Sequence, residues 1–379
     1  MARWTWSCTL KIAFDQQVFL LQEYGGISRY ICSLAKHLAQ MPNIDTRVVA
    51  PLHFNRNLDA LHGVSGKGIF LPKLPSKIFR LAIEASKHLS RRAINRFEPD
   101  ILHETYFSYD DYRPHKAKRV LTVYDMIHEK YADMFDQSGM TSGPKKAAVL
   151  RADHVICISE NTRRDLIEFC GVPEERTSVV YLSADVEFEV VGDTSKGKGL
   201  HGDRPFLLYV GNRGGYKNFD RFVRAFAQSE YLKKEFDIIC FGGGPLSTAE
   251  LTAAAGHGLR DNQLGYRSGS DSVLASLYLG AEALVYPSLY EGFGIPPLEA
   301  MAAGCAVICS NTSSVPEVVG DAGEYFDPNS EESMTAAMEL VLQSDERKAD
   351  LVARGLQQYR TFSWEKCARE TMSIYRSLT

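Results

Sequence analysis

Strand-like and helix-like segments alternate along the whole chain, and this alternation limits the fold more than any other feature. Short apolar runs that are typical of buried strands occur in two series. The first series comprises residues 10–15, 45–50, 101–103, 119–123, 154–158 and 178–181. The second comprises residues 206–210, 236–241, 263–266, 283–287 and 306–310. Segments such as 27–40 carry apolar residues at helical spacing, so the sequence predicts an α/β fold of parallel sheets covered by helices.

A polar, glycine-rich segment separates the two series. Residues 192–205 (GDTSKGKGLHGDRP) mix both charges, which is typical of a linker. The 379 residues are enough for about two domains. We therefore predict two Rossmann-like, doubly wound domains, 1–191 and 192–362, and a packed helix over 363–379. Ligands of such sheets bind beyond the carboxyl ends of the strands, so the site is expected in a cleft where the two sheets face each other.

Charge and cysteine usage narrow the partners and the compartment. The net charge is −4, which gives no global attraction to nucleic acid, so no nucleic-acid partner is predicted. The eight cysteines form no C-x-x-C pair, as expected for small buried side chains in a reducing compartment. No stretch reaches roughly 18 apolar residues, and the N-terminus lacks the apolar core of a signal peptide. We predict a cytoplasmic protein.

The segment EGFGIPPLE, residues 291–299, places two carboxylates around a glycine-rich loop. Gly292 and Gly294 permit a sharp turn, and the proline pair that follows suits the first positions of a helix. Backbone amides at such a helix start form an anion site. Glu299 in the first turn would lie beside that site and Glu291 at its mouth, where carboxylates suit sugar hydroxyls. The alternative is a helix whose first-turn Glu299 only complements the helix dipole.

A second glycine-rich loop, GNRGGYKN at residues 211–218, directly follows a predicted strand. Arg213 and Lys217 stand four residues apart in it, and two cations at the carboxyl end of a strand suit a diphosphate. The P-loop pattern G-x-x-x-x-G-K-[ST] is missing. The alternative is a pair of solvated loop charges.

Two more glycine clusters lie between a predicted strand and a helix. Gly25 and Gly26 offer amides for a diphosphate or allow a sugar to approach the backbone, although a plain helix cap explains them equally well. Gly243 lies in the run FGGGP, where a base or ribose could lie against the backbone. An ordinary strand-to-helix turn explains this run as well.

Three polar residues follow predicted strands in the first half of the chain. Asp125 and His128 come directly after residues 119–123, and His103 ends the strand predicted at 101–103. A histidine in such a place can hydrogen-bond a sugar hydroxyl or a phosphate, and Asp125 can orient it or bind an acceptor. A purely structural role is the alternative for either histidine.

The segment 73–97 is basic and amphipathic. It carries seven lysines and arginines against the single acid Glu84, with apolar residues on one side. Such a helix suits a membrane surface or an anionic acceptor. A surface helix with solvated charges is the alternative.

No D-x-D triplet occurs anywhere in the chain. A divalent metal held on a diphosphate by such carboxylates is therefore not predicted. Arg213, Lys217 and helix amides would balance the leaving-group charge instead.

Together, the segment 291–299, the loop of Arg213 and Lys217, and the pair Gly25-Gly26 resemble the family 4 retaining glycosyltransferases with the GT-B fold. The resemblance runs from Phe14 nearly to the C-terminus and includes residues 310–321. In detail, the runs YDMIHE and YVGNRGGYKN are similar to bacterial mannosyltransferases of O-antigen and capsule assembly.

The resemblance implies roles for individual residues. Glu299 would bind the ribose of the donor nucleotide, and Glu291 the hydroxyls of the transferred sugar. Tyr124 stands where many members have a histidine of a His-Asp pair, beside Asp125. The residues expected in catalysis are Arg213, Lys217, Glu291, His128 and Asp125. Those expected to bind the donor are Gly25, Gly26, His103, Gly211, Asn212, Gly243, Gly292, Phe293, Gly294, Ile295 and Glu299. The helix 363–379 would cross back onto the first domain.

The function that the resemblance implies is retaining transfer of a sugar, with mannose from GDP-mannose as the expected donor. The acceptor would be a saccharide or lipid-linked saccharide in surface polysaccharide synthesis, bound by the first domain. No cofactor or metal is expected, and the enzyme would be cytoplasmic or peripheral at the inner face of the cell membrane through residues 73–97. The alternatives are a UDP-sugar-dependent transferase, a sugar-nucleotide epimerase and a non-catalytic nucleotide-sugar-binding module.

Overall fold

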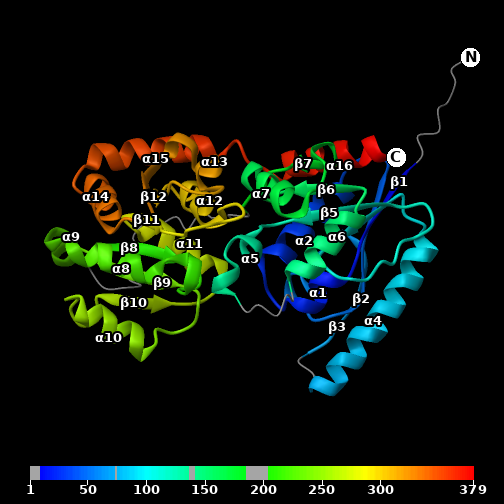
Figure 1. Cartoon of the computed structure of the whole chain (residues 1–379), viewed down its shortest axis with the longest axis horizontal. Coiled ribbons are helices and arrows are strands. Elements are labelled where there is room, and N and C mark those ends of the chain that lie inside the picture. The colour runs from blue at the N-terminus through cyan, green and yellow to red at the C-terminus, as the bar shows by residue number, and fades with distance from the viewer. Residues whose placement is uncertain (1–8, 73–74, 136–140, 185–203) are drawn as a thin grey trace, which may run out of the picture. The chain divides into compact units, whose positions relative to one another are not determined.

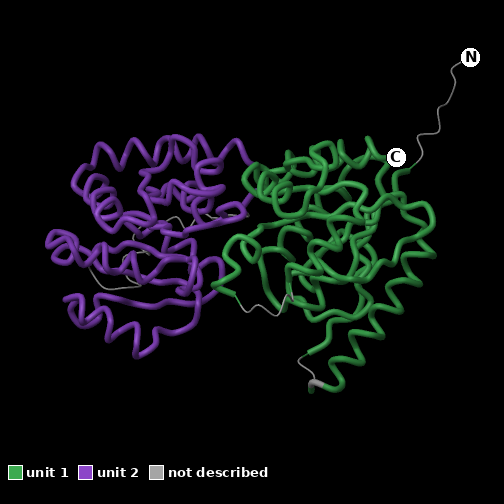
Figure 2. Tube along the Cα trace, viewed as in Figure 1, with its two compact units in different colours: residues 1–182, 363–379 green, residues 183–362 purple. Residues whose placement is uncertain are grey.

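The computed structural model describes residues 9–72, 75–135, 141–184 and 204–379. They form two compact units, residues 1–182 with 363–379 and residues 183–362 (Figure 2). The domain boundary predicted at 191/192 lies outside the described residues, as does the predicted linker apart from its last two residues. The final segment of the chain belongs to the first unit.

The first unit is built on a parallel sheet of seven strands in the order β3-β2-β1-β4-β5-β6-β7 (Figure 1). Ile12 of β1 is paired with Thr46 of β2 on one side and with Ile101 of β4 on the other. The strand order reverses between β1 and β4, and such a switch point is where doubly wound sheets bind ligands. The strands are β1 Leu10–Phe14, β2 Ile44–His53, β3 Ser65–Phe70, β4 Ile101–Glu104, β5 Lys118–Val123, β6 His154–Cys157 and β7 Thr177–Val179.

Helices cover this sheet, and local sequence sets where they begin and end. The side chain of Ser159 accepts a hydrogen bond from the Thr162 amide at the start of α7, and Gly171 ends that helix in the left-handed conformation. The helices are α1 Gln17–Leu21, α2 Gly26–Ala39, α3 Arg56–Asp59, α4 Ser76–Phe97, α5 Ile127–Lys130, α6 Ser142–Arg151, α7 Glu160–Cys170 and α16 Trp364–Leu378, with short 3-10 turns at Ala132–Met134 and Glu174–Arg176.

The last helix, α16, packs against α2 and completes the core of the first unit. The side chain of Ser363 caps it by accepting from the Lys366 amide. Trp364 lies 6.2 Å from Tyr30 of α2 between ring centroids. The hydroxyl of Tyr375 is 2.5 Å from Nδ1 of His103, which ties the end of the chain to strand β4.

The second unit contains a parallel sheet of six strands in the order β10-β9-β8-β11-β12-β13, which reverses between β8 and β11. The strands are β8 Phe206–Val210, β9 Asp237–Phe241, β10 Leu264–Arg267, β11 Ala283–Tyr286, β12 Ala306–Ser310 and β13 Gly323–Phe326. The helices are α8 Phe219–Gln228, α9 Glu230–Glu235, α10 Thr248–Gly256, α11 Asp271–Gly280, α12 Ile295–Ala302, α13 Val315–Val319, α14 Glu331–Leu342 and α15 Asp345–Tyr359, with 3-10 turns η4 Gly215–Lys217 and η5 Gly320–Ala322. Phe222 and Phe226 of α8 are fully buried in the core against the sheet.

Two edge strands and helix α1 are among the elements that were not predicted from the sequence. Strand β3 (SGKGIF) is an edge strand with two glycines and mostly exposed side chains, so it lacks an apolar pattern. Strand β13 (GEYF) is a short edge strand. Helix α1 falls between the predicted strand 10–15 and the predicted helix 27–40.

We expect the hydrogen bond between His103 and Tyr375 to stabilise the first unit. Tyr375→Phe should lower its free energy of unfolding by about 1–3 kcal/mol, because a buried histidine nitrogen loses its partner. Trp364 is the only tryptophan among the described residues and packs near Tyr30 in the first unit, so urea unfolding followed by tryptophan fluorescence reports on that unit. Tyr24→Phe, at an exposed tyrosine, is the matched control. Equal stability of the two variants would contradict the prediction.

Candidate active site

Three loops of the second unit meet at the carboxyl ends of β8, β9 and β11. The amide of Gly211 donates to the carbonyl of Phe241 (2.9 Å), which joins the loops after β8 and β9. The amide of Leu289 donates to the carbonyl of Tyr216 (2.8 Å), which joins the loops after β8 and β11. The predicted loops 211–218 and 291–299 therefore lie together at the switch point of the sheet.

Lys217 and Glu291 form an ion pair between two of these loops. The Lys217 Nζ donates to Glu291 Oε1 at 2.7 Å, with side chains only 16% and 12% exposed. The buried hydroxyl of Tyr286 is hydrogen-bonded to Glu291, and burial followed by the carboxylate charge raises the pKa of this tyrosine well above its usual value. Asn218, in the left-handed conformation with φ of 59°, anchors the loop by donating to Pro287 O (3.0 Å). The structure thus places a cation directly beside a carboxylate.

The guanidinium of Arg213 is directed at protein acceptors rather than held as a solvated charge. Its Nε donates to Glu250 Oε1 (2.6 Å), Nη1 to Gly242 O (2.9 Å), and Nη2 to Gly244 O (2.8 Å) and Pro245 O (2.9 Å). The side chain is 5% exposed. Four of the five N–H groups of an arginine are therefore engaged. The contact of Arg213 with a diphosphate stays a prediction, whereas its hold on the FGGGP loop is observed.

Glu250 is the partner of Arg213 and was not predicted. It is the third residue of α10, where it and Ser247 form a capping box. Burial raises the pKa of Glu250, but the hydrogen bonds from Arg213 and Ser247 outweigh burial and lower it below its usual value. One carboxylate therefore fixes both the start of α10 and the position of the guanidinium.

Gly243 lies close to the loop after β8. It has a φ of 72°, and a Cβ there would meet the Asn212 Cα and the Gly211 carbonyl, each at 3.1 Å. Any side chain would thus push the two loops apart. A Cβ on Gly211 itself would meet nothing within 4 Å, although its φ of 134° favours glycine.

The loop after β11 leads into α12 through Gly294, which has a φ of 119°. The hydroxyl of Ser314 donates to the carbonyls of Glu291 (2.8 Å) and Phe293 (2.9 Å) and so holds the loop shape. The Phe293 ring is buried and packs edge-on against Phe362. The amides of Gly294 and Ile295 have no hydrogen-bond acceptor in the described part of the chain, and the prolines that follow have no N–H to offer.

Glu299 lies one turn further along the helix than predicted. Helix α12 begins at Ile295, so Glu299 is its fifth residue and belongs to the second turn. Its first-turn position in the sequence interpretation is therefore wrong. The buried hydroxyl of Tyr278 on α11 donates to Glu299 Oε2 at 3.0 Å. Burial, and then the Glu299 charge, raise the pKa of Tyr278 well above its usual value, so the tyrosine remains a donor.

In the first unit, Gly25 caps the start of α2. A Cβ on Gly25 would lie 2.2 Å from the Gln22 side-chain oxygen, whereas one on Gly26 would meet nothing within 4 Å. Asn57 donates to the Gly25 carbonyl (3.3 Å) and to the Ser28 hydroxyl (2.9 Å). The end of the flexible Gln22 side chain can move away, so packing does not require a glycine at position 25, and Gly26 is exposed.

Asp125 and His128 both follow β5, and Asp125 contacts a buried lysine that was not predicted. The Lys145 Nζ donates to the Asp125 carbonyl (3.0 Å) and to Glu129 Oε2 (2.8 Å), and lies 3.8 Å from Asp125 Oδ1. The Nδ1 of His128 is buried and has no hydrogen-bond partner among the residues that the structure describes. Its ring packs against Phe135 at 4.4 Å between centroids.

His103 is not available to a ligand, which corrects its predicted role in donor binding. It is fully buried, with Nδ1 against the Tyr375 hydroxyl (2.5 Å) and Nε2 against the Thr122 hydroxyl (2.9 Å). Burial lowers the pKa of His103 to about 3, so the ring is neutral. The sequence places His103 at a strand end but cannot show that α16 covers it.

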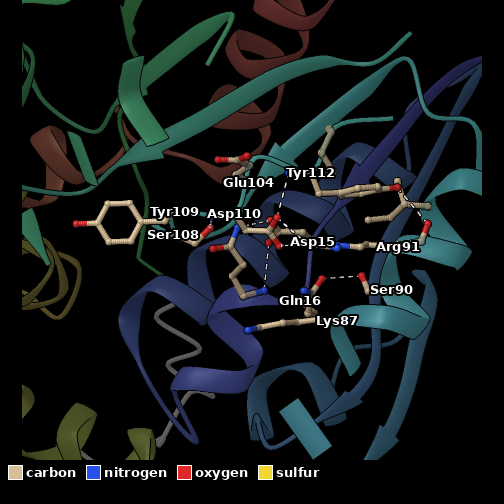
Figure 3. Close-up of a pocket in the computed structure, with 13 residues that line it drawn as sticks. Asp15, Gln16, Lys87, Ser90, Arg91, Glu104, Ser108, Tyr109, Asp110 and Tyr112 are labelled. Atoms are coloured by element: carbon tan, nitrogen blue, oxygen red, sulfur yellow. Dashed lines mark hydrogen bonds and ion pairs between the residues drawn. The ribbon is translucent and has the colours of Figure 1, made fainter. Parts of the chain in front are cut away.

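A pocket of about 290 Å³, lined mainly by residues with polar side chains, lies at the carboxyl ends of β1 and β4 in the first unit (Figure 3). Asp15 and Glu104 contribute buried carboxylates, and Lys87, Ser90 and Arg91 come from α4. Burial raises the pKa of Glu104 to about 7, against the hydrogen bond from Arg151 that lowers it.

Comparison with known families identifies the class of protein. Residues 24–188 match the family described as Glycosyltransferase Family 4, and residues 192–358 match the family described as Glycosyl transferases group 1. The two matches together cover most of the chain. The chain therefore belongs to the glycosyltransferases that combine these two domains.

Individual proteins agree with this assignment. The chain is 28% identical to O-antigen chain mannosyltransferase B of Escherichia coli, over 93% of this chain and 96% of that protein. Its fold is similar to that of sucrose-phosphate synthase from Thermosynechococcus elongatus, with a TM-score of 0.76, 20% identity and coverage of 97% and 99%. It is also similar to Anabaena Alr3699/HepE in complex with UDP-glucose, with a TM-score of 0.73, 16% identity and coverage of 97% and 100%. The predicted GT-B fold is confirmed.

Four residues that support the site escaped the sequence interpretation. Tyr286 and Tyr278 hydrogen-bond Glu291 and Glu299, and Glu250 and Lys145 form ion pairs. For Glu250 a signal was present, because Ser247 three residues earlier forms the S-x-x-E pattern of a capping box. That pattern marks a helix start but says nothing of Arg213.

The pair of Arg213 and Glu250 predicts a pH-dependent stability. Glu250→Gln should lower the free energy of unfolding of the second unit by about 1–2 kcal/mol at pH 7, because a charged hydrogen bond and part of a cap are lost. Since the folded pKa of Glu250 lies below its ordinary 4.5, the pair stabilises fully above pH 4.5 and less as the pH falls through the folded value.

Urea unfolding of wild type and Glu250→Gln at pH 7 and at pH 4, followed by circular dichroism, measures this difference. Glu235→Gln, at a half-exposed surface carboxylate, is the control. The gap for Glu250→Gln should narrow at pH 4. A gap that widens on acidification would contradict the assigned direction.

Proposed function

We propose that this glycosyltransferase transfers mannose from GDP-mannose, with retention, to a saccharide or lipid-linked saccharide acceptor in surface polysaccharide synthesis. The observation that carries the proposal is the contact of Lys217 with Glu291 at the switch point of the second sheet. This contact places a cation of the kind that binds phosphate beside a carboxylate of the kind that binds sugar hydroxyls. The similarity to a mannosyltransferase over nearly the whole chain supports the choice of mannose.

The donor would lie on the second unit. Glu299, which accepts a hydrogen bond from Tyr278, would also accept the ribose hydroxyls. Glu291 would accept hydroxyls of the transferred sugar. The amides of Gly294 and Ile295 at the start of α12 supply partial positive charge for a phosphate.

Lys217 would stabilise the leaving phosphate. Its Nζ is 2.7 Å from the carboxylate of Glu291, so a cation and the sugar-binding group are held at one fixed spacing. Charge stabilisation of this preorganised kind lowers the barrier to departure of a nucleoside diphosphate. Arg213 would contribute mainly by fixing the FGGGP loop, against which Gly243 lets the nucleoside lie.

Retention without a metal is part of the proposal. We infer a front-face attack in which an oxygen of the departing phosphate takes the proton of the acceptor hydroxyl. The missing D-x-D triplet and the presence of Lys217 support a leaving group balanced by the chain's own cation and amides.

The first unit would bind the acceptor. Asp125 and His128 would contact the sugars, with Lys145 as the group that fixes their segment. Gly26 leaves open space at the start of α2 for the donor sugar or its phosphates.

We also propose peripheral contact with the inner face of a membrane through α4. This helix carries six lysines and arginines against one glutamate, and its outer side exposes Ile78, Leu81 and Leu89. Amphipathic helices of this composition bind anionic lipid surfaces. None of the helices within the described residues is long and apolar enough to span a membrane.

Donor identity is the part of the proposal that a binding screen tests most directly. Calorimetry or thermal shift with GDP-, UDP-, ADP- and dTDP-sugars should give the tightest binding for GDP-mannose. A preference for a UDP-sugar would overturn the assignment in favour of the nucleotide seen with the Anabaena protein. Release of free GDP only when acceptor is present would favour transfer over epimerisation or simple binding.

We expect substitution of Lys217 to cause the largest loss of transfer rate. Lys217→Ala should lower kcat by roughly 10²-fold or more, as removal of a single stabilising donor does elsewhere. Lys234→Ala, at a lysine that is 82% exposed in the same unit, is the matched control and should keep normal turnover. Near-normal turnover of Lys217→Ala would contradict the proposed role of Lys217 in stabilising the leaving phosphate.

A further inference from the structure

An apolar groove of about 620 Å³ lies in the first unit, beyond the carboxyl ends of β2 and β3. Its walls come from four different elements or their ends: Leu20 and Leu21 from α1, Phe54 after β2, Phe70 at the end of β3, and Phe79 from α4. The rings of Phe54 and Phe79 are in contact at 4.7 Å between centroids. None of these residues is needed for the proposed chemistry, so the groove calls for a separate explanation.

The groove leaves apolar side chains exposed to solvent that would normally be buried. Leu21, which lines it, is 61% exposed. Ile69, the neighbour of Phe70 on β3, is also largely exposed. Exposed apolar residues that gather around one groove indicate an apolar partner.

The charges around the groove select the kind of partner. Arg56 lies at the mouth, 4.5 Å above the Phe70 ring, and its ion pair with Glu23 is a loose one at 3.6 Å between half-exposed side chains. Lys77 and Arg80 flank Phe79 in the sequence of α4 and are exposed. An apolar groove beside a net positive surface matches a hydrocarbon chain that carries an anionic head group.

We propose that this groove binds the hydrocarbon chain of the lipid-linked acceptor, with its phosphate at Arg56. The inference rests on the proposed transfer to a lipid-linked saccharide. Helix α4 would take part in both membrane contact and lipid binding. Its outer side would rest on the membrane, and Phe79 on its inner side forms one wall of the groove. The chain leaves the bilayer into the groove, which holds the acceptor in the first unit.

Binding of dodecyl phosphate, below its critical micelle concentration, tests the proposal without donor or turnover. Calorimetry on the full chain should show dodecyl phosphate binding at least about 10-fold more tightly than ethyl phosphate, because burial of many methylene groups is favourable. Phe79→Ser and Leu21→Ser should each weaken dodecyl phosphate binding about 10-fold and leave ethyl phosphate unchanged. Leu21 is exposed, so its variant folds even where Phe79→Ser does not.

Leu81→Ser is the matched control. It makes the same kind of change on the outer side of α4, outside the groove, and should keep dodecyl phosphate binding while weakening binding to anionic phosphatidylglycerol vesicles. Equal binding of dodecyl and ethyl phosphate by wild type, or no effect of Leu21→Ser, would overturn the proposal. A dimer in sedimentation that Leu21→Ser dissociates would assign the groove to a second copy and overturn it as well.

Failure of this inference is separable from failure of the proposed function. If the wild-type protein transfers mannose to a water-soluble saccharide yet shows no preference for dodecyl phosphate, the proposed function stands and the role of the groove is contradicted. If it binds dodecyl phosphate tightly but transfers no sugar, the role of the groove stands and the proposed function is contradicted.

Discussion

The candidate site depends on two cations that the second unit holds almost out of water. A buried charge is stable only when it is paired, so each cation requires a carboxylate. Arg213 has Glu250 on α10, and Lys217 has Glu291 after β11. These two pairs tie the loops after β8, β9 and β11 to one another, and Gly243 allows the close approach of the loops after β8 and β9, since a Cβ there would meet the Gly211 carbonyl and the Asn212 Cα at 3.1 Å.

The two cations have different roles, whereas the sequence suggested two equivalent cations for a diphosphate. Arg213 directs its hydrogen bonds at the FGGGP loop and stabilises the position of that loop. Lys217 donates to Glu291 and lies over the rings of Tyr216 and Tyr286, between the loops after β8 and β11. In the proposed function this lysine contacts a phosphate oxygen while it keeps its carboxylate. Removal of Glu291 would change the sugar contact and the state of Lys217 together, so its effect cannot be assigned to either alone.

The sequence predicted what local pattern controls and missed what distant contacts control. Apolar runs placed most strands of both sheets, but β3 and β13 are edge strands without such a run. The loops of Lys217 and Glu291 were found because glycine, charge and a preceding strand lie within a few residues. Glu250 and Tyr278 were not, since they reach their partners from 37 and 21 residues away. His103 was misjudged because Tyr375, which covers it, is 272 residues distant.

That last contact has a consequence for how the chain folds. The second unit is continuous in sequence, from residue 183 to 362, and all its core residues are available before the last helix is made. The first unit is not complete until α16 brings Trp364 to Tyr30 and Tyr375 to His103. Until then the inner side of α2 and a buried histidine lack their partners, which costs stability. Synthesis from the N-terminus would therefore leave the first unit unfinished while the second folds, so α16 sets the order in which the two units reach their final state.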